Sequence, residues 1–224
     1  MMAAALLSCL FVSMPVSAQS NVEEDHKHAW GENIGWTNWR DAGGADEGVA
    51  VGAAVLSGYV WCENVGWVHV GDGTPDGGVD PEQYDNDDAS DFGVNVDADG
   101  GLHGYAWGEN IGWLNFNGGA LAEPAQPARV ECDGRLSGHA WSENAGWINL
   151  DDAEHYVATT DVPISCDMNG DGAVDGDDIQ VFVDALLLGE ADWMETCSGD
   201  LEAVPDGGID ADDVAAFVSC LLGE

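Results

Sequence analysis

One seven-residue pattern, Trp-x-Glu-Asn-x-Gly-Trp, occurs four times and constrains the fold more than any other feature of the chain. The first tryptophan of each copy stands at position 30, 61, 107 or 141, and the second always follows six positions later. Self-similarity at such spacing indicates a repeat architecture, in which each unit contributes part of a shared core. Eight of the 10 tryptophans lie in the pattern, as the pairs Trp30 and Trp36, Trp61 and Trp67, Trp107 and Trp113, and Trp141 and Trp147.

Each copy predicts a tight β-hairpin. Strand-like runs flank the pattern, as in Leu102–Trp107 before the third copy and Trp113–Phe116 within and after it. Between them, Asn tolerates positive φ and bonds its own backbone, while Gly adopts positive φ without steric cost. The five residues between the tryptophans therefore reverse the chain, and the two indoles are expected to face each other on neighbouring strands. Cross-strand aromatic pairs of this kind stabilise a sheet by roughly 0.2–1 kcal/mol.

A further short strand is expected before three of the four hairpins, at 48–51, 93–96 and 129–132. The first hairpin lacks such a strand, whereas the run 155–160 follows the last hairpin without a partner. We expect residues 155–160 to supply the missing strand of the first copy and to close the array into a barrel or ring, which would remove exposed sheet edges. An open β-solenoid or a sandwich is the competing arrangement.

The tryptophan pairs have two interpretations. They can form the core, because a small repeat with few other bulky residues must bury its aromatics. Alternatively, one tryptophan of each pair stays exposed and stacks on sugar rings, so that all eight are candidate ligand-binding residues. Turn formation explains the Asn and Gly of the pattern but not its constant Glu. In the second interpretation hydroxyl groups of a sugar bond the pairs Glu32-Asn33, Glu63-Asn64, Glu109-Asn110 and Glu143-Asn144.

The charge balance excludes several classes of function. The chain has 43 acidic and 4 basic residues among 224, a formal net charge of -39. Such a protein is repelled by DNA, RNA and anionic lipid, so no nucleic-acid partner is expected. Its 45% hydrophobic content argues against disorder. No nucleophile motif, phosphate loop or metal-binding helix motif suggests catalysis, so no catalytic residue is assigned; a glycoside hydrolase using paired carboxylates is the remaining enzymatic alternative.

The N-terminus predicts export. Residues 1–18 carry no charged side chain and end in Val16-Ser17-Ala18, which fits a signal peptide cleaved after Ala18. The apolar run is too short for a transmembrane helix, and no other segment could span a bilayer. Five cysteines follow Ala18, so two disulfides and one unpaired thiol are expected in an oxidising compartment. One pairing considered is Cys62 with Cys132, which would link two repeats.

A calcium loop is predicted at 167–178, after the composition changes near residue 161. Oxygen-bearing side chains occupy loop positions one, three, five, nine and twelve, and Gly172 stands at position six where the chain must bend sharply. A helix should follow from 179 and end at Gly189. The expected ligands are Asp167, Asn169, Asp171, the carbonyl of Ala173, Asp175 and Asp178.

A second copy of the loop and helix follows, but the first half of its loop does not keep the ligand spacing of the first copy. Counting back from Asp213 places Glu202 at position one; alternatively Asp200 is the first ligand and the loop contains two extra residues. One oxygen is missing or displaced in either register, so weaker calcium binding, or none, is expected here. The candidate ligands are Asp200, Glu202, Asp206, Gly208, Asp210 and Asp213.

The insert Gly71–Asp91, between the second and third copies, contains eight acidic residues. It is expected to form a solvated surface loop. A calcium site within it is the alternative, because its oxygen ligands are dense and flexible.

The tandem loop-and-helix units, with Asp at position twelve, resemble a type I dockerin, and the repeats resemble the uncharacterised "GYAW-ENIGW-IN" repeats of exported bacterial proteins. The resemblance implies a small α-helical calcium domain at 161–224 that attaches an exported protein to a cohesin-like or cell-surface protein. Gly176-Asp177 and Ala211-Asp212 depart from the hydroxyl residues with which dockerins usually recognise cohesins. The predicted domain organisation is therefore a signal peptide (1–18), a mainly β repeat domain (19–160) and the dockerin-like domain (161–224). We expect an exported, non-enzymatic binding or structural protein, or alternatively a carbohydrate-binding accessory protein of a polysaccharide-degrading system.

Overall fold

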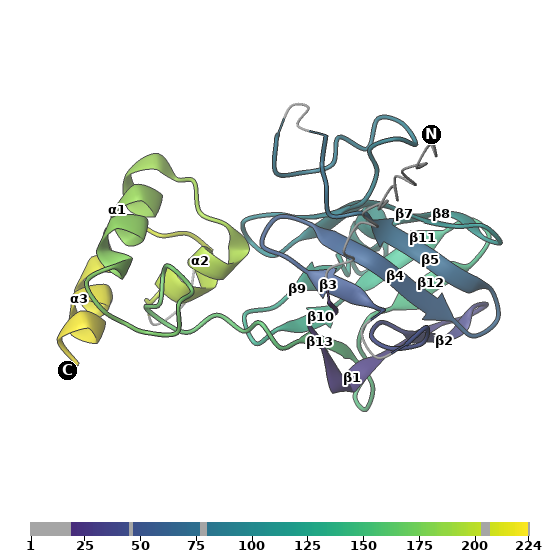
Figure 1. The fold of residues 1–224 in the computed structure, drawn as a ribbon, viewed down its shortest axis with the longest axis horizontal. Helices are drawn as coiled ribbons and strands as arrows, with labels where there is room; N and C mark the ends of the chain where they lie inside the picture. The colour runs from purple at the N-terminus through teal and green to yellow at the C-terminus, as the bar shows by residue number, and fades with distance from the viewer. Residues whose placement is uncertain (1–18, 45–46, 77–79, 203–206, 224) are drawn as a thin grey trace, which may run out of the picture.

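Four antiparallel hairpins close into an eight-stranded β-barrel (Figure 1). The computed structural model describes residues 19–44, 47–76, 80–202 and 207–223, and the predicted signal peptide lies outside them. Each Trp-x-Glu-Asn-x-Gly-Trp copy is the turn of one hairpin, as predicted. The barrel strands are β1 (Val22–Gly31), β2 (Gly35–Asn38), β4 (Leu56–Cys62), β5 (Gly66–Gly71), β7 (Leu102–Gly108), β8 (Gly112–Asn115), β11 (His139–Ser142) and β12 (Gly146–Asn149).

The first and last hairpins meet to close the ring. Strand β12 pairs with β1, with Trp30 opposite Asn149 and Gly31 opposite Ile148. Every barrel strand therefore has a neighbour on each side, and the predicted closed barrel is confirmed. The open solenoid and the sandwich were wrong alternatives.

Short strands extend the sheet at the end of the barrel away from the hairpin turns. The predicted leading strands of the second and third hairpins pair with β4 and β7. The expected pairing of 155–160 with the first copy is also found, because Val22 of β1 lies opposite Thr159. Direct β12–β1 pairing, however, is what joins the two ends of the barrel. These strands are β3 (Val49–Val51), β6 (Val94–Val96), β9 (Arg129–Val130), β10 (Arg135–Ser137) and β13 (Val157–Thr159).

The alternation of side chains along the strands places the paired tryptophans outside the barrel. The residue before the first tryptophan of each copy (Ala29, Val60, Ala106 or Ala140) is buried and points inward, so its tryptophan neighbour must point outward. Seven of the eight paired tryptophans are exposed, and the eighth is half-buried. The interpretation of the pairs as the core was therefore wrong. The narrow interior of an eight-stranded barrel takes small and medium side chains instead.

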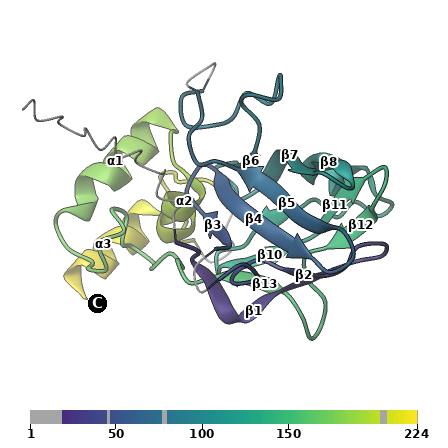
Figure 2. The ribbon, with the colours of Figure 1, turned by 45° about the vertical axis from the view of Figure 1, so that its right-hand side comes forward.

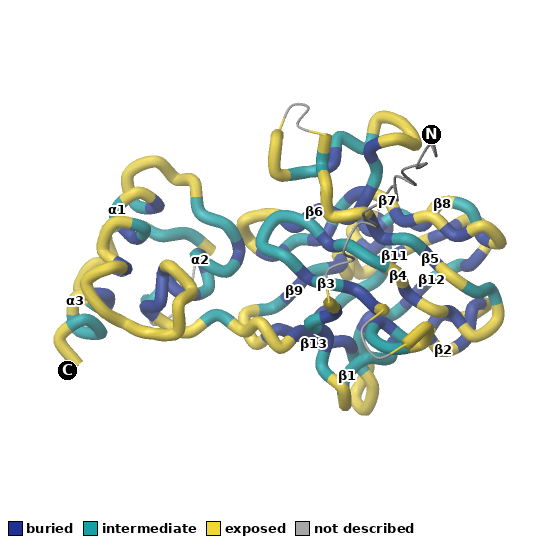
Figure 3. The backbone as a smooth tube through the Cα atoms, in the orientation of Figure 1, coloured by how far each residue is buried: buried dark blue, intermediate teal, exposed yellow. Residues whose placement is uncertain are grey.

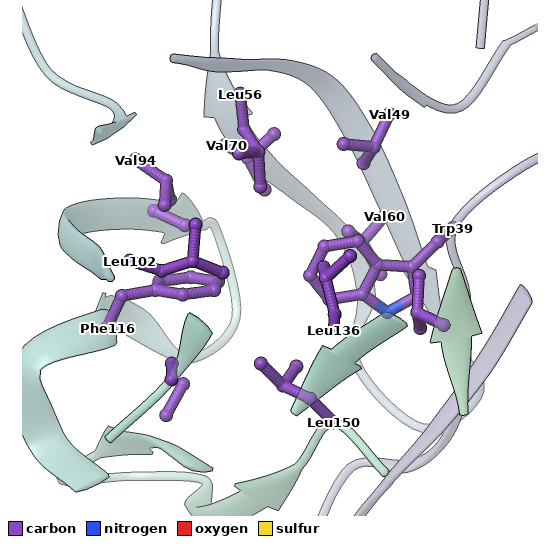
Figure 4. Packing of buried hydrophobic residues seen from close by; sticks show 14 of the residues in the cluster. Trp39, Val49, Leu56, Val60, Val70, Val94, Leu102, Phe116, Leu136 and Leu150 are labelled. Atoms are coloured by element: carbon purple, nitrogen blue, oxygen red, sulfur yellow. The ribbon is translucent and has the colours of Figure 1, made fainter. Parts of the chain in front are cut away.

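Two aromatic residues of the barrel domain from outside the tryptophan pairs contribute to the main core (Figure 4). Trp39, directly after β2, is 2% exposed, and its indole Nε1 donates to Thr37 Oγ1 at 3.0 Å. Phe116, at the start of the 3₁₀ helix η1 (Phe116–Leu121), is 1% exposed. Together with the aliphatic residues of β3, β4 and β6 they fill the barrel away from the hairpin turns.

The three helices follow the barrel, and α2 (Trp193–Gly199) lies against it (Figures 1 and 2). Trp193 is 1% exposed within the barrel's own core cluster, and its Nε1 donates to the Gly52 carbonyl at 3.1 Å. A disulfide between Cys132 and Cys197 joins the same two parts. The helix side chain and the covalent bond therefore attach the C-terminal helices to the barrel.

The outer helices α1 (Asp178–Leu188) and α3 (Val214–Leu222) form a second, smaller core. Phe182 and Phe217 stack in parallel with ring centroids 4.0 Å apart. The Cys166–Cys220 disulfide links the start of the first acidic loop to α3. Two disulfides and one free cysteine were predicted and are found, but the suggested pairing of Cys62 with Cys132 was wrong, because Cys62 is buried in the barrel as a free thiol.

The part of the insert that the structure describes projects from the barrel between β5 and β6, and most of it is exposed (Figure 3). Within the described residues, no helix combines the length and the apolar character that crossing a membrane requires.

Candidate functional site

An outward-facing belt of tryptophans surrounds the barrel close to the hairpin turns. In each pair the two indoles lie directly opposite on neighbouring strands, with ring centroids 4.7–5.1 Å apart and the rings steeply inclined. Edge-to-face packing of this kind stabilises a pair while leaving part of each ring open to solvent. The exposed fractions of the seven exposed members lie between 36% and 42%. Exposed apolar surface gathered in this way is typical of interaction sites in general, which makes the belt a candidate site.

Other aromatic residues extend the belt along the strands. Tyr59 stacks on His69, with centroids 4.5 Å apart. The ring centroid of Phe92 lies 5.4 Å from that of His69 and 5.1 Å from that of Trp113. Phe92, directly after the insert, therefore bridges the second and third repeats. On the first repeat, the ring centroids of His155 and Trp36 lie 4.7 Å apart. The sequence did not point to the contacts of Phe92 and His155, because these two residues lie outside the hairpins.

A hollow of about 560 Å³ lies between the first and second repeats. Trp36 and Trp61 belong to its walls, and Asn38 stands opposite Trp61 across the β2–β4 pairing. Glu63 also lines it. The volume falls within the roughly 300–1,000 Å³ of typical small-molecule sites.

Two imidazoles complete the walls of this hollow, from His28 of β1 and His155 near β13. Burial lowers the pKa of His28 below the ordinary histidine value, and the nearby Lys27 ammonium adds to the effect. A neutral imidazole offers one hydrogen-bond donor and one acceptor, so near neutral pH His28 can bond a hydroxyl group in either direction.

The Asn of each motif links its turn to the next one around the ring. The side-chain amides of Asn33, Asn110 and Asn144 donate to the carbonyls of Ala145, Val65 and Ile111 at 2.8–3.1 Å. At the remaining junction the backbone N–H of Asn64 donates to the Ile34 carbonyl at 3.1 Å. The motif Asn therefore serves the closed ring as well as its own turn, and three of the four predicted sugar-bonding amides already donate within the protein.

The constant Glu has a different environment. Its side chain is exposed at all four turns. Glu63 and Glu32 lie over Gly35 and Gly146 of the neighbouring turns, where a Cβ would stand 3.1 and 3.5 Å from a carboxylate oxygen. A Cβ at Gly35 would be tight against the neighbouring turn, whereas at Gly146 it would meet the Glu32 oxygen at ordinary contact distance; both glycines also have positive φ, which strains any other residue. The exposed carboxylates keep their capacity to accept hydrogen bonds from a ligand.

The first acidic loop fixes the carboxylates of its first and last predicted ligands, Asp167 and Asp178, by backbone hydrogen bonds. Asp178 is fully buried and accepts from the N–H groups of Met168 and Asn169 with Oδ1 and of Asp175 with Oδ2. Asp167 Oδ2 accepts from Gly172 N–H at 2.8 Å. The other carboxylate oxygen of Asp167, Oδ1, is buried and has no hydrogen-bond partner in the described structure, and the whole residue is 4% exposed. A buried carboxylate oxygen left unpaired is costly, and a cation would satisfy it.

The second acidic loop repeats this bonding pattern. Asp213 Oδ1 accepts from Leu201 and Glu202, and its Oδ2 accepts from Asp210. Asp200 Oδ2 accepts from Gly207 N–H at 2.8 Å, and Asp200 Oδ1 is a buried oxygen with no hydrogen-bond partner, as in Asp167.

These contacts select between the two registers considered for the second loop. Asp200 follows Asp167 by 33 positions, whereas Gly207 follows Gly172 by 35, so the second loop is two residues longer. Asp200 is therefore equivalent to position one and Glu202 to position three, while the candidate ligand Asp206 lies outside the described residues. The remaining candidates follow the first loop, with Gly208 equivalent to Ala173, Asp210 to Asp175 and Asp213 to Asp178.

The insert contains a separate carboxylate group. Asp76, Asp85 and Asp91 each place an oxygen within 4.8 Å of the others, a spacing that can hold a metal ion. Asp91 is buried and accepts from Asp85 N–H at 2.8 Å. The sequence indicated that the insert was rich in oxygen ligands, but not which three residues would meet.

Comparisons with protein families, with curated proteins and with solved structures find no match to this chain. The class of protein therefore follows from its own geometry: an antiparallel β-barrel with an aromatic outer belt, joined to helices that follow acidic loops.

Proposed function

We propose that this is an exported, non-enzymatic binding protein in which a calcium-binding, dockerin-like tail carries a ligand-binding barrel. The observation that carries the calcium proposal is the buried, unpartnered Oδ1 of Asp167, repeated by Asp200 in the second loop. Calcium prefers carboxylate and carbonyl oxygens, and these loops supply both. When bound, the ion would neutralise the loop carboxylates and hold each loop closed against its helix.

The first loop offers Asp167, Asn169, Asp171, the Ala173 carbonyl, Asp175 and Asp178 as ligands. The second offers Asp200, Glu202, the Gly208 carbonyl, Asp210 and Asp213 among the described residues. The two loops share the same backbone bonds to their first and last carboxylates, which supports two sites instead of one.

Calorimetry of the full chain with calcium and with EDTA tests this proposal. Calcium should raise the unfolding temperature, because a ligand at 100 times its Kd adds about 2.7 kcal/mol to the stability of the state that binds it. Asp171→Ala should remove the contribution of the first loop, since Asp171 is exposed and its loss creates no cavity. Asp177→Ala is the matched control, because Asp177 is also exposed but is not a ligand position. Equal unfolding temperatures with calcium and EDTA would refute the proposal.

The exposed tryptophan pairs favour a carbohydrate as the ligand of the barrel. One face of a pyranose ring carries C–H groups whose partial positive charge suits the electron-rich face of an indole. The barrel keeps seven large indoles in contact with water although burial would stabilise them, and this supports a binding role. Quenching or a blue shift of tryptophan fluorescence on titration with soluble polysaccharides would support this proposal, and an unchanged spectrum with every glycan would oppose it.

Export and attachment complete the proposal. Two disulfides suit an oxidising compartment, and N-terminal sequencing of the mature protein should begin at Gln19. The tail is proposed to attach the barrel to a cohesin-like or cell-surface protein. Pull-down of the calcium-loaded chain with cell-wall fractions, against an EDTA-treated sample, tests that role.

A further inference from the structure

We propose that the hollow between β2 and β4 is the principal sugar-binding groove of the barrel, and that its ligand is an uncharged glycan. This inference rests on the carbohydrate proposal above and assigns it to one of the four junctions between repeats. The groove is lined by Trp36, Asn38, Trp61, Glu63, His28 and His155.

The aromatic walls come from different repeats. Trp36 is the second tryptophan of the first repeat and Trp61 is the first of the second repeat, and both are 37% exposed. Two indoles across one hollow can contact successive sugar rings or both faces of a single ring. The hollow beside Tyr59 is lined by one tryptophan, Trp67, and the hollow beside Tyr105 by one tryptophan, Trp113. The hollow at the junction of the first two repeats therefore presents two indoles to a ligand, whereas the hollows beside Tyr59 and Tyr105 present one each.

The other junctions of the belt are partly covered by protein. Phe92, directly after the insert, packs against His69 of the second repeat and Trp113 of the third. Helix η1 lies against Trp141, where a Cβ on Gly118 would meet the Trp141 Cβ at 2.4 Å. Trp147, beside the fourth junction, is only half-exposed. These contacts leave less room for a ligand where the repeats are otherwise alike.

The polar groups of the groove suit hydroxyls. Asn38 stands opposite Trp61, and the backbone N–H of Glu63 is fixed to the Trp36 carbonyl at 2.9 Å, which holds the Glu63 side chain beside the indoles. A carboxylate accepts hydrogen bonds from two adjacent hydroxyls. The Asn38 amide already donates to Asp41 Oδ1 and accepts from the N–H groups of Arg40 and Asp41, so it shapes the groove wall and leaves hydroxyl bonding to Glu63 and the imidazoles. Lys27 Nζ forms an ion pair with Asp41 Oδ2 at 2.7 Å. The Lys27 ammonium group beside the groove is therefore already neutralised.

The charge of the site determines the class of glycan. Glu63 and the net charge of -39 repel carboxylated or sulfated sugars. A neutral hexose or pentose polymer avoids this repulsion, and its hydroxyls can bond Glu63 and the two imidazoles.

Isothermal titration of the calcium-loaded full chain tests the assignment. The probes are soluble cello-, xylo- and manno-oligosaccharides, with alginate oligosaccharides as the anionic comparison. We expect one of the neutral series to bind at one site per chain, and Trp61→Ala to weaken that binding at least tenfold. Trp107→Ala is the matched control, because Trp107 has the same place in the third repeat and is 39% exposed. Glu63→Gln should weaken binding while Glu109→Gln does not.

The alternative outcomes are distinct. Equal losses for Trp61→Ala and Trp107→Ala, or several equivalent sites per chain, would overturn the single groove and leave the carbohydrate proposal standing. Tighter binding of alginate than of every neutral probe would overturn the uncharged class. Failure of the folded wild-type chain to bind any glycan would overturn the carbohydrate proposal and the groove together.

Discussion

The side-chain amide of Asn33 donates a 3.1 Å hydrogen bond to the carbonyl of Ala145, 112 residues further along the chain. It joins the turn of the first hairpin to the turn of the last, beside the β1–β12 pairing that closes the barrel. Equivalent bonds from Asn110 and Asn144 join the other turns. A residue type that each hairpin needs for its own turn thus also joins neighbouring turns at three of the four junctions, in addition to the strand pairing that closes the ring.

Asn33→Ala should lower the free energy of unfolding by about 1 kcal/mol or somewhat more, because it removes this bond and leaves the Ala145 carbonyl without its donor. Urea denaturation followed by far-UV circular dichroism measures the change. Glu32→Ala in the same turn is the control and should alter stability little, since its side chain is exposed. Equal effects of the two substitutions would show that the inter-turn bond adds nothing to barrel closure.

Asp200→Asn should weaken calcium binding by the second loop and leave the first loop intact. The substitution removes the negative charge beside the buried oxygen that lacks a partner in the described structure. Calcium titration should then show one strong site where the wild type shows two. Asp212→Asn, which changes charge equally at an exposed position, should preserve both. Unaltered binding in Asp200→Asn would favour the register that begins at Glu202.

Trp193→Ala should cost roughly 3–5 kcal/mol, the range for deleting a large buried aromatic side chain. Trp193 is 1% exposed in the barrel core although it belongs to α2. Chemical denaturation of oxidised protein gives the value. Trp107→Ala deletes an equally large but 39% exposed side chain and should cost clearly less. A larger loss for Trp107→Ala would contradict the outward orientation of the belt.

The Cys62 thiol should resist alkylation in the folded protein. Burial raises its pKa to about 12, so almost no thiolate exists at mildly alkaline pH, and the barrel wall excludes reagents. Peptide mapping after iodoacetamide treatment should find Cys62 unmodified in native protein and modified after unfolding in denaturant. Rapid labelling of the native protein would instead indicate local opening of β4.

Stability should depend on pH through the partly buried histidines. Burial lowers the pKa of His69 in the folded state, so the unfolded chain binds a proton at higher pH than the folded one. Falling pH therefore favours unfolding through this group, with the effect setting in near the ordinary histidine pKa of about 6.5.

The difference in unfolding free energy between wild type and His69→Gln isolates that effect from the general charge repulsion of the protein. As pH falls from about 7.5 to 5.5, on either side of the ordinary histidine range, the wild type should lose stability relative to the variant. Urea denaturation at fixed calcium concentration measures it. A wild type that gains relative stability over this interval would show the opposite linkage.

Local patterns in the sequence determined the hairpins, their turns and the acidic loops. The two tryptophans of each copy face each other because five intervening residues with Asn and Gly can form only a short turn. The spacing of Asp167, Asn169 and Asp171 likewise predicts converging oxygens, because alternate positions of a tight loop point to one side. These features depend on residues close in the chain, so no tertiary information was needed.

Tertiary structure alone decided which side of each strand became the core. Only the closure of four hairpins into a narrow barrel turns Ala29 and its equivalents inward and Trp30 outward; a flat sheet of the same hairpins could bury the indoles. The same closure brings Trp36 beside Trp61 and Asn33 beside Ala145, and places Trp193 in the core of the barrel. These contacts join segments far apart in the chain, and their geometry is set by packing around the ring, which no local pattern records.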